Sequence, residues 1–281
     1  MPMTQAHIFQ IFYSEDTRKM LDPGYIPLDN LSNERPDWRE YWPIRRFLKN
    51  TELREGDFYG FFSPKFREQT GLSPEEVKQF IEPDYDVISF LYVFDQSCGF
   101  VNVFEQGEAH HKGLFSLTQK LLDEIGYRVQ LDNAVMDSRH TIFSNYFVAK
   151  AAFWREWFHL SEKLFHIAEQ GAPGRFKDEL NASVHHGSLQ VSAKVFIMER
   201  IASLMLATKP HWRIKPYNPF VLPPSTAIIG SFTLDLIILD ALKIAYNTVQ
   251  HPQYATAFAQ VREGLGRKVE ERMKFNRPGR A

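Results

Sequence analysis

The first half of the chain alternates short apolar runs with polar, helix-like segments. Four of the apolar runs are rich in β-branched and aromatic residues, and they are short enough to be strands. These runs are His7–Tyr13, Asp57–Ser63, Asp86–Phe94 and Thr141–Ala149. The third is apolar at nearly every position, which is typical of a strand that is covered on both faces, as in a parallel sheet.

The polar segments between these runs carry signals for the starts of helices. Asp37 and Glu40 have the spacing of a capping box, and Pro43 either kinks the helix that follows or delays its start. The sequence Ser-Pro-Glu-Glu at 73–76 is a second capping box with proline at the first helical position. A further helix is expected over 114–125, where Gly126 ends it.

The second half of the chain is dominated by helical periodicity. Apolar residues recur at helical spacing between Phe153 and Ala168, and three more helices are expected over Ser192–Ala207, Leu234–Val249 and Phe258–Met273. The proline-rich stretch Pro210–Pro224 is expected to be a loop. This order predicts an α/β domain over residues 1–207 and a helical extension over 208–281 packed on the same domain.

Composition and charge exclude several classes of protein. With 44% hydrophobic and 24% charged residues, the chain of 281 residues is typical of a folded globular protein. Its 33 basic and 34 acidic residues leave a net charge of −1, which argues against a nucleic-acid partner. The single cysteine, Cys98, excludes an internal disulfide and a cysteine zinc site. No secretory signal and no apolar run of about 20 residues stands out, so we expect a cytoplasmic protein.

The common mechanistic motifs are absent. The sequence has no GxGxxG after a strand, no GxxxxGK[ST], no HExxH and no GxSxG, which argues against four widespread enzyme classes. The adjacent histidine pairs at 110–111 and 185–186 are poor metal chelators, because neighbouring side chains diverge. Candidate chemistry must therefore be sought in less specific clusters of polar residues.

Two such clusters lie near the strongest strand. Asp95 follows the run Asp86–Phe94 directly, and open α/β sheets bind ligands beyond the carboxyl ends of their strands. On a helix, Asn102 and Glu105 share a face, and His110 lies further along. A loop aspartate that caps a turn and a solvated helix face are the structural alternatives.

A third cluster is the pair Glu199 and Arg200, which interrupts an apolar helix. A charge in such surroundings is costly unless it is paired or binds a ligand. A structural ion pair and a functional site are both compatible with this pattern. We expect the pair to support the scaffold of the site.

Six stretches of the chain, taken in order, resemble bacterial glycosyltransferase-like proteins from capsule, exopolysaccharide and O-antigen synthesis clusters. They are WREYWPIRRFLKN, GDFYGFFSPKF, DYDVISFLYVF, NVFEQGEAHHKGL, SNYFVAKAAFWREWF and FIMERIASLML. The resemblance covers roughly residues 7 to 207. It implies a GT-A-like (Rossmann-like) fold, with a mostly parallel sheet covered by helices on both faces. It also implies transfer of a sugar from a nucleotide-diphosphate donor to a saccharide or lipid-linked acceptor.

The resemblance implies roles for particular residues. The expected contacts are Asp29 and Asn30 at the nucleotide, Ser63 and Lys65 at the diphosphate, and Asn102, Glu105, His110 and Asn145 at the sugars. Asp95 is expected to bind a divalent metal (Mn²⁺ or Mg²⁺) or the sugar, and Glu105 or His110 to act as the base. The family's Asp-x-Asp metal motif has a single match, at residues 84–86, which precedes its strand instead of following it.

Two alternatives stay open at this point. One is a non-catalytic carbohydrate-binding or assembly module that kept the fold and lost the metal. The other is an unrelated hydrolase that uses Asp95 and His110. Stabilisation by a nucleotide sugar distinguishes a transferase from the hydrolase.

The last predicted helix carries an apolar stripe and many cations. Phe258, Val261, Leu265, Val269 and Met273 form the stripe, and seven Lys and Arg residues lie among three Glu. A basic amphipathic helix can dock on the anionic inner face of a membrane, and this is one interpretation. The other is that the stripe packs on the domain. The oligomeric state is left open by the sequence.

Overall fold

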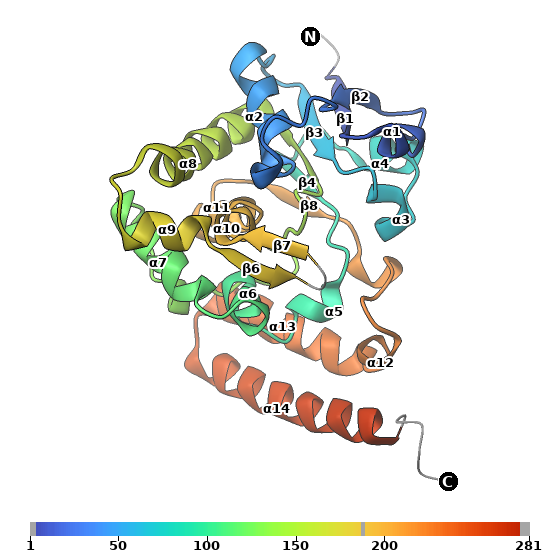
Figure 1. Ribbon diagram of the computed structural model, residues 1–281. Helices are drawn as coiled ribbons and strands as arrows, with labels where there is room; N and C mark the ends of the chain where they lie inside the picture. Colours follow the sequence, from blue (N-terminus) through green and yellow to red (C-terminus); the bar gives the residue numbers. More distant parts are fainter. Residues whose placement is uncertain (1–3, 187–188, 276–281) are drawn as a thin grey trace.

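The core of the protein is a six-stranded sheet. The structure, a computed structural model, describes residues 4–186 and 189–275 (Figure 1). In spatial order the strands are β2 (Ile26–Asp29), β1 (Ala6–Phe12), β3 (Phe58–Phe62), β5 (Phe147–Lys150), β4 (Val87–Ser89) and β8 (Ile214–Pro216). The sheet is mixed, because β5 runs antiparallel to both of its neighbours while the other pairings are parallel.

Helices cover both faces of this sheet. The side chains of β3 alternate: Phe58 and Phe62 pack on the side of α3 (Phe66–Thr70) and α4 (Pro74–Phe80), whereas Tyr59 and Phe61 belong to the larger core on the opposite side. That larger core includes residues of α2 (Tyr41–Asn50) and α8 (Ala151–Gln170). The fold is therefore α/β with a mixed sheet.

Glycine is required at one position of the central strand pair. A Cβ atom on Gly60 of β3 would lie 2.8 Å from Cγ2 of Val148 on β5. Any side chain at this position would push β3 and β5 apart.

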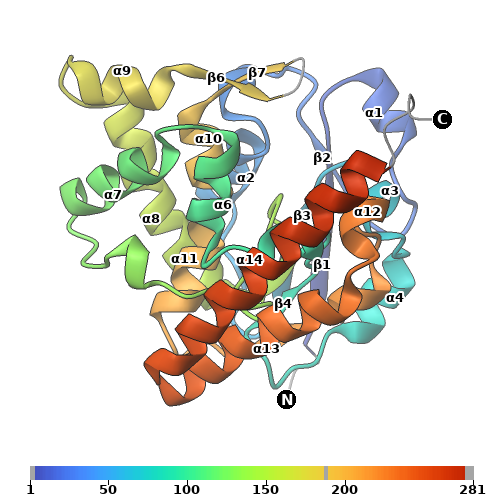
Figure 2. The ribbon, with the colours of Figure 1, turned by 90° about the horizontal axis from the view of Figure 1, so that it is seen from below.

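The remaining elements lie around the carboxyl ends of the strands and below the sheet. They comprise α1 (Glu15–Lys19), η1 (Pro36–Trp38), α5 (Phe94–Ser97), α6 (Val103–His110), α7 (Leu114–Glu124), η2 (Leu131–Asn133), α9 (Arg175–Asn181), the hairpin β6 (Ser183–His186) and β7 (Leu189–Ser192), α10 (Ala193–Met198), α11 (Ile201–Thr208), η3 (Pro219–Val221), α12 (Ala227–Gly230), α13 (Thr233–Val249) and α14 (Pro252–Phe275). The two last helices lie below the rest of the molecule in Figure 1 and cross its underside in Figure 2.

The C-terminal helices pack on the rest of the chain. Leu236 and Leu239 of α13 and Phe258 and Leu265 of α14 are buried in the larger core. The expected stripe of α14 therefore faces inward, apart from Met273, which is exposed. None of the helices in the described residues combines the length and hydropathy needed to cross a lipid bilayer. The division at residue 207 stays a prediction.

The strand predictions succeed where the run is continuous and fail at the strand ends. The runs at 7–13 and 57–63 correspond to β1 and β3, but the run at 86–94 pairs only over three residues. Val93 adopts a left-handed backbone conformation and takes the chain out of the sheet. The run at 141–149 likewise pairs only from Phe147, because Ser144 and Asn145 are left-handed. Strands β2 and β8 are missed by the sequence patterns.

Two of the helix predictions are corrected. The Asp37 side chain binds Arg35 and Lys194 instead of capping a helix, and α2 begins at Tyr41 without a side-chain cap. The helix expected over 192–207 is interrupted, since α10 ends before Glu199 and α11 begins after Arg200. The capping box predicted at residues 73–76 is confirmed, since Ser73 and Glu76 bind each other's backbone at the start of α4.

Candidate active site

Two adjoining cavities open at the carboxyl ends of the parallel strands. Tyr13 follows β1 and Asn30 follows β2, and both line the first cavity; Tyr92, which comes after β4, lines the second. Each cavity has a volume of about 470 Å³. The residues common to both are Arg39, Glu40 and Val191. The two cavities therefore form one cleft.

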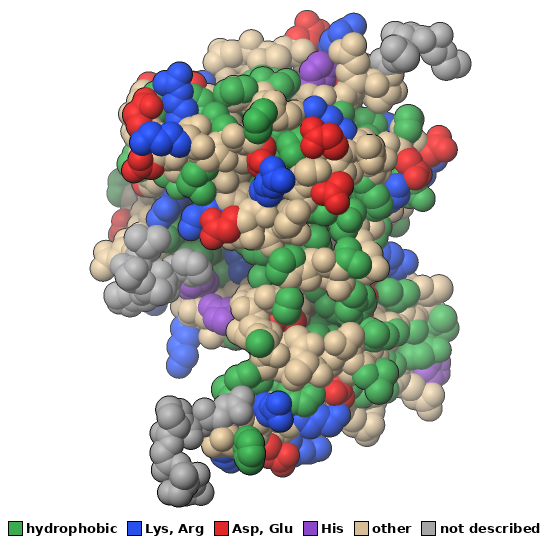
Figure 3. All heavy atoms as spheres, turned by 90° about the vertical axis from the view of Figure 1, so that its right-hand side faces the viewer, with side chains coloured by type: hydrophobic (Ala, Val, Ile, Leu, Met, Phe, Trp, Pro, Cys, Tyr) green, Lys and Arg blue, Asp and Glu red, His purple; other side chains and the backbone are tan. Residues whose placement is uncertain are grey.

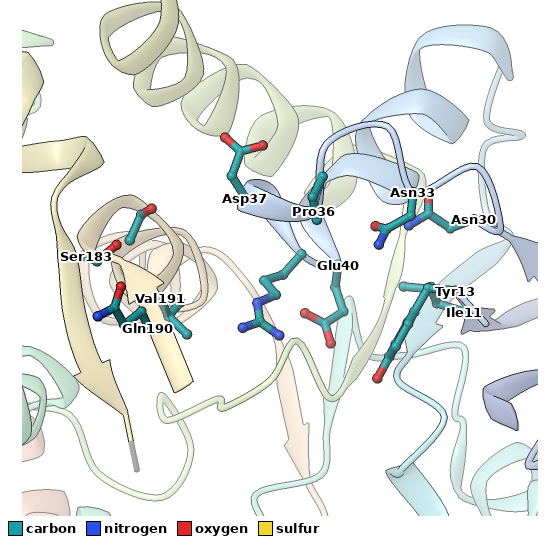
Figure 4. A pocket seen from close by; sticks show the side chains of 12 residues that line it. Ile11, Tyr13, Asn30, Asn33, Pro36, Asp37, Glu40, Ser183, Gln190 and Val191 are labelled. Carbon is teal, nitrogen blue, oxygen red and sulfur yellow. The ribbon is translucent and has the colours of Figure 1, made fainter. Parts of the chain in front are cut away.

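Figure 4 shows how the first cavity is arranged. The Glu40 carboxylate lies in the middle of the view, between Val191 of the β6–β7 hairpin and the ring of Tyr13. Asn30 and Asn33 lie above Tyr13, and Asp37 points away from the centre. The cavity thus lies between a β-hairpin on one side and the ends of β1 and β2 on the other.

The segment that carries Arg39 and Glu40 is held by a charge network around the buried Lys194. Lys194 Nζ lies 2.6 Å from Asp37 Oδ2 and 3.3 Å from Glu169 Oε1. The indole nitrogen of Trp38 donates to the same Glu169 oxygen over 2.8 Å. Because these bonds join η1 to α8 and α10, the residues at 39–40 are fixed at the edge of the cleft.

Glu199 faces the second cavity from the break between α10 and α11. No described residue forms a hydrogen bond with its carboxylate. Burial, followed by the negative charge of Glu40, raises the pKa of Glu199 to about 7, although the positive charges of Arg200 and Arg39 oppose the shift. A carboxyl group whose pKa lies near neutrality is suited to accept or donate a proton in a reaction.

Arg200, the next residue, is buried at the wall of the same cavity, and its guanidinium is held by protein acceptors. Its guanidinium donates to the carbonyls of Val103 and Phe196, over 2.8 Å each, and to Gln106 Oε1 over 2.9 Å. Burial lowers the pKa of Arg200 to about 10. A Cβ atom on Gly107 of α6 would lie 2.6 Å from Leu114 Cδ2 and 3.1 Å from Arg200 Nε, so glycine leaves room for both side chains at this point. Arg200 thus joins α6 to α10.

Backbone strain is concentrated at the cleft. Five of the six non-glycine residues with positive φ in the described part of the chain line the cleft or adjoin it, namely Asn33, Arg39, Val93, Ser144 and Asn145. The β-branched Val93, with φ of 54°, is the least compatible with this conformation. Such strain is typical of segments whose geometry is set by function.

Two buried amide oxygens at this edge lack partners. No described residue donates a hydrogen bond to Oδ1 of Asn30, which lines the first cavity, or to Oδ1 of Asn145. Leaving a buried acceptor unpaired costs about 1–3 kcal/mol. A ligand that supplies an N–H or O–H group to Asn30 would remove this cost.

Among the residues expected from the sequence, some lie at the cleft or at the same edge of the sheet. Asn30 lines the first cavity, and His110, exposed at the end of α6, lines the second. Ser63 follows β3, but its hydroxyl is hydrogen-bonded to the Tyr146 hydroxyl over 2.6 Å. Lys65 is exposed two residues further on and lines neither cavity.

The structure does not place Asp95 in the cleft. Its Oδ1 atom accepts a hydrogen bond from the backbone of Ser225 over 2.9 Å, and its Oδ2 atom accepts one from the Ser225 hydroxyl. The backbone of Thr226 adds a longer contact of 3.4 Å. Asp95 therefore anchors the loop before α12, and the expected roles in metal, sugar or hydrolytic chemistry find no support in its contacts.

Two further expected residues are engaged in structural contacts. The Glu105 carboxylate accepts from Arg262 of α14 over 2.7 Å and from the backbone of Val101 over 2.6 Å. Asn102 caps α6 with its side-chain oxygen and donates to two carbonyls of the loop that contains η2. Neither residue lines the cleft.

Asp29 is likewise engaged outside the cleft. It is exposed at the end of β2, and its Oδ1 atom accepts from the backbone of Leu31 over 2.8 Å. This is a local turn contact.

The expected metal site also does not fit. Asp86, the second aspartate of the Asp-x-Asp sequence, binds Lys150 and the backbone of Arg213 at the amino end of β4, opposite to the cleft. Both carboxylate oxygens of Asp95 are occupied by hydrogen bonds. In the part of the chain that the structure describes, no group of three or more His, Cys, Asp or Glu side chains could hold a metal ion.

The sequence patterns missed most of the cleft. Arg39 and Tyr92 are not singled out by any motif, and Glu40 is singled out only as the second residue of the expected capping box with Asp37. Glu199 was singled out by its position in an apolar run, but it was assigned to the scaffold together with Arg200. The sequence thus indicates that two charges in this apolar run are unusual. It does not indicate which of them is hydrogen-bonded by the protein.

Comparisons of the chain with models of protein families, with curated proteins and with solved structures found no match.

Proposed function

We propose that this chain is a glycosyltransferase of surface-polysaccharide synthesis that moves a sugar from a nucleotide-diphosphate donor to a saccharide or lipid-linked acceptor within the cleft. The observation that carries the proposal is the position of Glu199. It is a carboxylate with a near-neutral pKa, without a hydrogen-bond partner among the described residues, in a cavity at the carboxyl edge of the sheet. A GT-A-like fold is part of this proposal.

The location of the cleft supports the proposal. Open α/β sheets bind ligands outside the carboxyl ends of their strands, and nucleotide-binding folds use this edge. Two joined cavities of about 470 Å³ each are of the size that ligand pockets usually have. One cavity can therefore take the nucleotide while the other takes the sugars.

The first cavity has groups suited to a nucleoside. The Tyr13 ring is 42% exposed and can stack on a base. The unpaired Oδ1 atom of Asn30 can accept a hydrogen bond from the edge of the base. In this proposal Asn30 keeps the nucleotide-binding role expected from the sequence.

The second cavity has polar groups suited to sugar hydroxyls. Gln69, Tyr92, Gln96, His110 and Ser144 line it. Small numbers of placed polar groups in a pocket provide orientation and specificity.

The proposed reaction uses Glu199 as the base. Its carboxylate takes the proton of the acceptor hydroxyl while the hydroxyl oxygen forms a bond to the anomeric carbon of the donor. The bond from that carbon to the phosphate oxygen breaks, and the nucleoside diphosphate leaves with the electron pair. Arg39, which lines both cavities, is placed to stabilise the negative charge on the leaving group. No step runs through a metal at Asp95.

A nucleotide panel with one variant and one control tests the proposal. Melting temperatures are measured with UDP, GDP and their sugars, with and without Mn²⁺, for the intact chain, Glu199→Gln and Glu124→Gln. Glu124 is an exposed carboxylate outside the cleft. We expect a nucleotide to raise the melting temperature of all three proteins. We expect only Glu199→Gln to lose sugar transfer, by about 100-fold or more.

Three outcomes would contradict the proposal in different ways. If no nucleotide raises the melting temperature of the intact chain, the cleft is not a nucleotide-sugar site. If saccharides alone stabilise the chain and transfer is absent, the chain is a carbohydrate-binding module. If Glu199→Gln transfers sugar as well as Glu124→Gln does, Glu199 is not the base.

A further inference from the structure

A chain of hydrogen bonds runs from the end of β3 to the wall of the second cavity. The backbone N–H of Lys65 donates to Ser63 Oγ over 3.2 Å, and Ser63 Oγ lies 2.6 Å from the hydroxyl oxygen of Tyr146. The Tyr146 hydroxyl donates to Gln69 Oε1. Tyr146 is fully buried, whereas Gln69 is half-buried and lines the cavity. The chain therefore connects the interior of the protein to the cleft.

This chain has one direction, because each hydroxyl group has a single proton to donate. Burial raises the pKa of Tyr146 well above its ordinary value, so its hydroxyl group keeps that proton. The proton is used on Gln69 Oε1, and the Ser63 hydroxyl therefore donates to Tyr146. The oxygen of the Gln69 amide is thus bound within the protein, and its nitrogen is the end that faces the cavity.

The burial of Tyr146 does not by itself require the bond to Gln69. The Ser63 hydroxyl already lies within hydrogen-bond distance of the Tyr146 oxygen. What the bond to Gln69 adds is a fixed rotation of the amide. An amide that turns by 180° exchanges its donor for its acceptor, so the bond determines which of the two a ligand meets.

Two hydroxyl groups lie beside this amide. The Tyr92 hydroxyl oxygen lies 2.8 Å from Ser144 Oγ, and both residues line the second cavity. Burial raises the pKa of Tyr92, whereas Ser144 and Gln69 lower it, which places the Gln69 side chain close to the same hydroxyl. Ser144 and Asn145 have φ angles of 53° and 54°, so a strained turn joins the cavity wall to Tyr146. Such strain is typical of segments whose geometry is set by function.

The charges on the neighbouring surface are mixed. Figure 3 shows the side of the molecule that carries α3 and α4, where Lys and Arg side chains lie among Asp and Glu side chains in the upper half of the view. A sugar is selected by a few placed donors and acceptors in its pocket. The orientation of one amide at the cavity wall is therefore a means of selection.

We propose that Tyr146, itself held by Ser63, is a positioning residue that keeps the N–H groups of Gln69 toward the second cavity, where they donate to an oxygen atom of the bound sugar. Gln69 then selects a sugar with a hydroxyl or carbonyl oxygen at this point. The inference rests on the proposed function, because it takes a sugar as the ligand of the second cavity. Ser63, expected from the sequence at the diphosphate, acts here through Tyr146.

Calorimetric titration of the full chain tests the inference. The probes are the sugar nucleotide that raises the melting temperature most and the matching nucleoside diphosphate without the sugar. The variants are Tyr146→Phe, Gln69→Met and the two combined. The matched control is Tyr127→Phe, which removes a tyrosine hydroxyl that lies 2.6 Å from Thr208 Oγ1 and belongs to a residue that lines neither cavity. Melting temperatures confirm that each variant is folded.

We expect Gln69→Met and Tyr146→Phe each to weaken binding of the sugar nucleotide by about five- to tenfold, the range for one lost hydrogen bond. Binding of the nucleoside diphosphate should change by less than about twofold in both, because the sugar alone is contacted. The combined variant should bind no more than about twofold weaker than Gln69→Met, since Tyr146 acts through the amide. Tyr127→Phe should bind both probes as the intact chain does.

The inference fails alone if the intact chain binds the sugar nucleotide and Gln69→Met binds it as tightly; this comparison decides even if Tyr146→Phe does not fold. It also fails if the combined variant is much weaker than Gln69→Met, because Tyr146 then acts independently. An equal loss for the nucleoside diphosphate would overturn it too, since the whole cleft would be disturbed.

Failure of the proposed function has a different signature, namely that no nucleotide stabilises the intact chain. Free hexoses and N-acetylhexosamines then replace the sugar nucleotide in the same comparison. A loss of their binding in Gln69→Met and Tyr146→Phe but not in Tyr127→Phe would support the inference without the transferase. An intact chain that binds none of these sugars would overturn both.

Discussion

Glu199 and Arg200 are neighbours in the chain and both line the second cavity, yet only one of them is bound by protein groups. Three acceptors bind the Arg200 guanidinium, whereas no described residue forms a hydrogen bond with the Glu199 carboxylate. Each charge is taken from water, but only one is compensated by protein groups. Glu199, the uncompensated charge, therefore has a pKa that is raised toward neutrality.

The raised pKa of Glu199 makes stability depend on pH. A carboxyl group whose pKa is higher in the folded state carries no penalty below its unfolded value near 4.5. The penalty grows as the pH rises to about 7 and is constant above it. A shift from 4.5 to about 7 corresponds to at most about 3 kcal/mol. Above pH 7 the charged Glu199 thus opposes folding.

We therefore expect Glu199→Gln to stabilise the protein at pH 8 and to have little effect at pH 4.5. The substitution removes a charge that is costly only when ionised. Thermal unfolding at the two pH values, with Glu124→Gln as the control, measures the difference. An equal change in melting temperature at both pH values would contradict the raised pKa.

At the scale of elements, predictions from the sequence succeed where a segment's own residues determine its structure. Examples are the capping box at residues 73–76 and the continuous apolar runs that form β1 and β3. The edge strands β2 and β8 are short and contain proline, and β2 is mostly exposed while β8 is half-buried, so their pairing depends on neighbours that the local pattern does not reveal. The left-handed residues Val93, which follows β4, and Ser144, which precedes β5, mark where the chain outside these strands departs from the sheet, and the apolar runs do not reveal them.

The cleft was less predictable than the sheet. Glu40 and Glu199 come from distant parts of the chain, and they influence each other only because η1 is fastened to α8 and α10 by the Lys194 network. The sequence indicated that a charge at Glu199 was unusual. It did not indicate which of the two adjacent charges would be neutralised.

Arg200 joins α6 to α10, and its removal should therefore destabilise the fold. In Arg200→Ala, the carbonyls of Val103 and Phe196 and the side chain of Gln106 lose their donor, at a cost of about 3 kcal/mol or more. We expect the melting temperature to fall by roughly 6–12 °C. Arg262→Ala, which removes a half-exposed partner of Glu105, is the control and should change it by less than about 4 °C.

A folded Arg200→Ala protein with an unchanged melting temperature and no activity would reverse this assignment. It would mean that Arg200 acts on a ligand. Its position, enclosed by α6 and α10 with all three bonds made to the protein, argues against that outcome.

At the scale of the whole molecule, the C-terminal helices belong to the larger core. Leu236 and Leu239 of α13 are buried in it, together with Phe258 and Leu265 of α14. The ion pair between Arg262 and Glu105 also fastens α14 to α6. Removal of α14 therefore tests its contribution to the stability of the fold.

We expect a chain that ends at Tyr254 to be markedly less stable than the intact chain. It loses the buried side chains of Phe258 and Leu265, each of which contributes about 1.5–3 kcal/mol by burial, and it leaves Glu105 without its cation. The expected fall in melting temperature is about 10 °C. A chain that ends at Phe275 keeps all of α14 and serves as the control. If the shorter chain melts like the control, α14 is an appendage whose apolar stripe is free to bind elsewhere; if it melts lower, the helix is part of the fold.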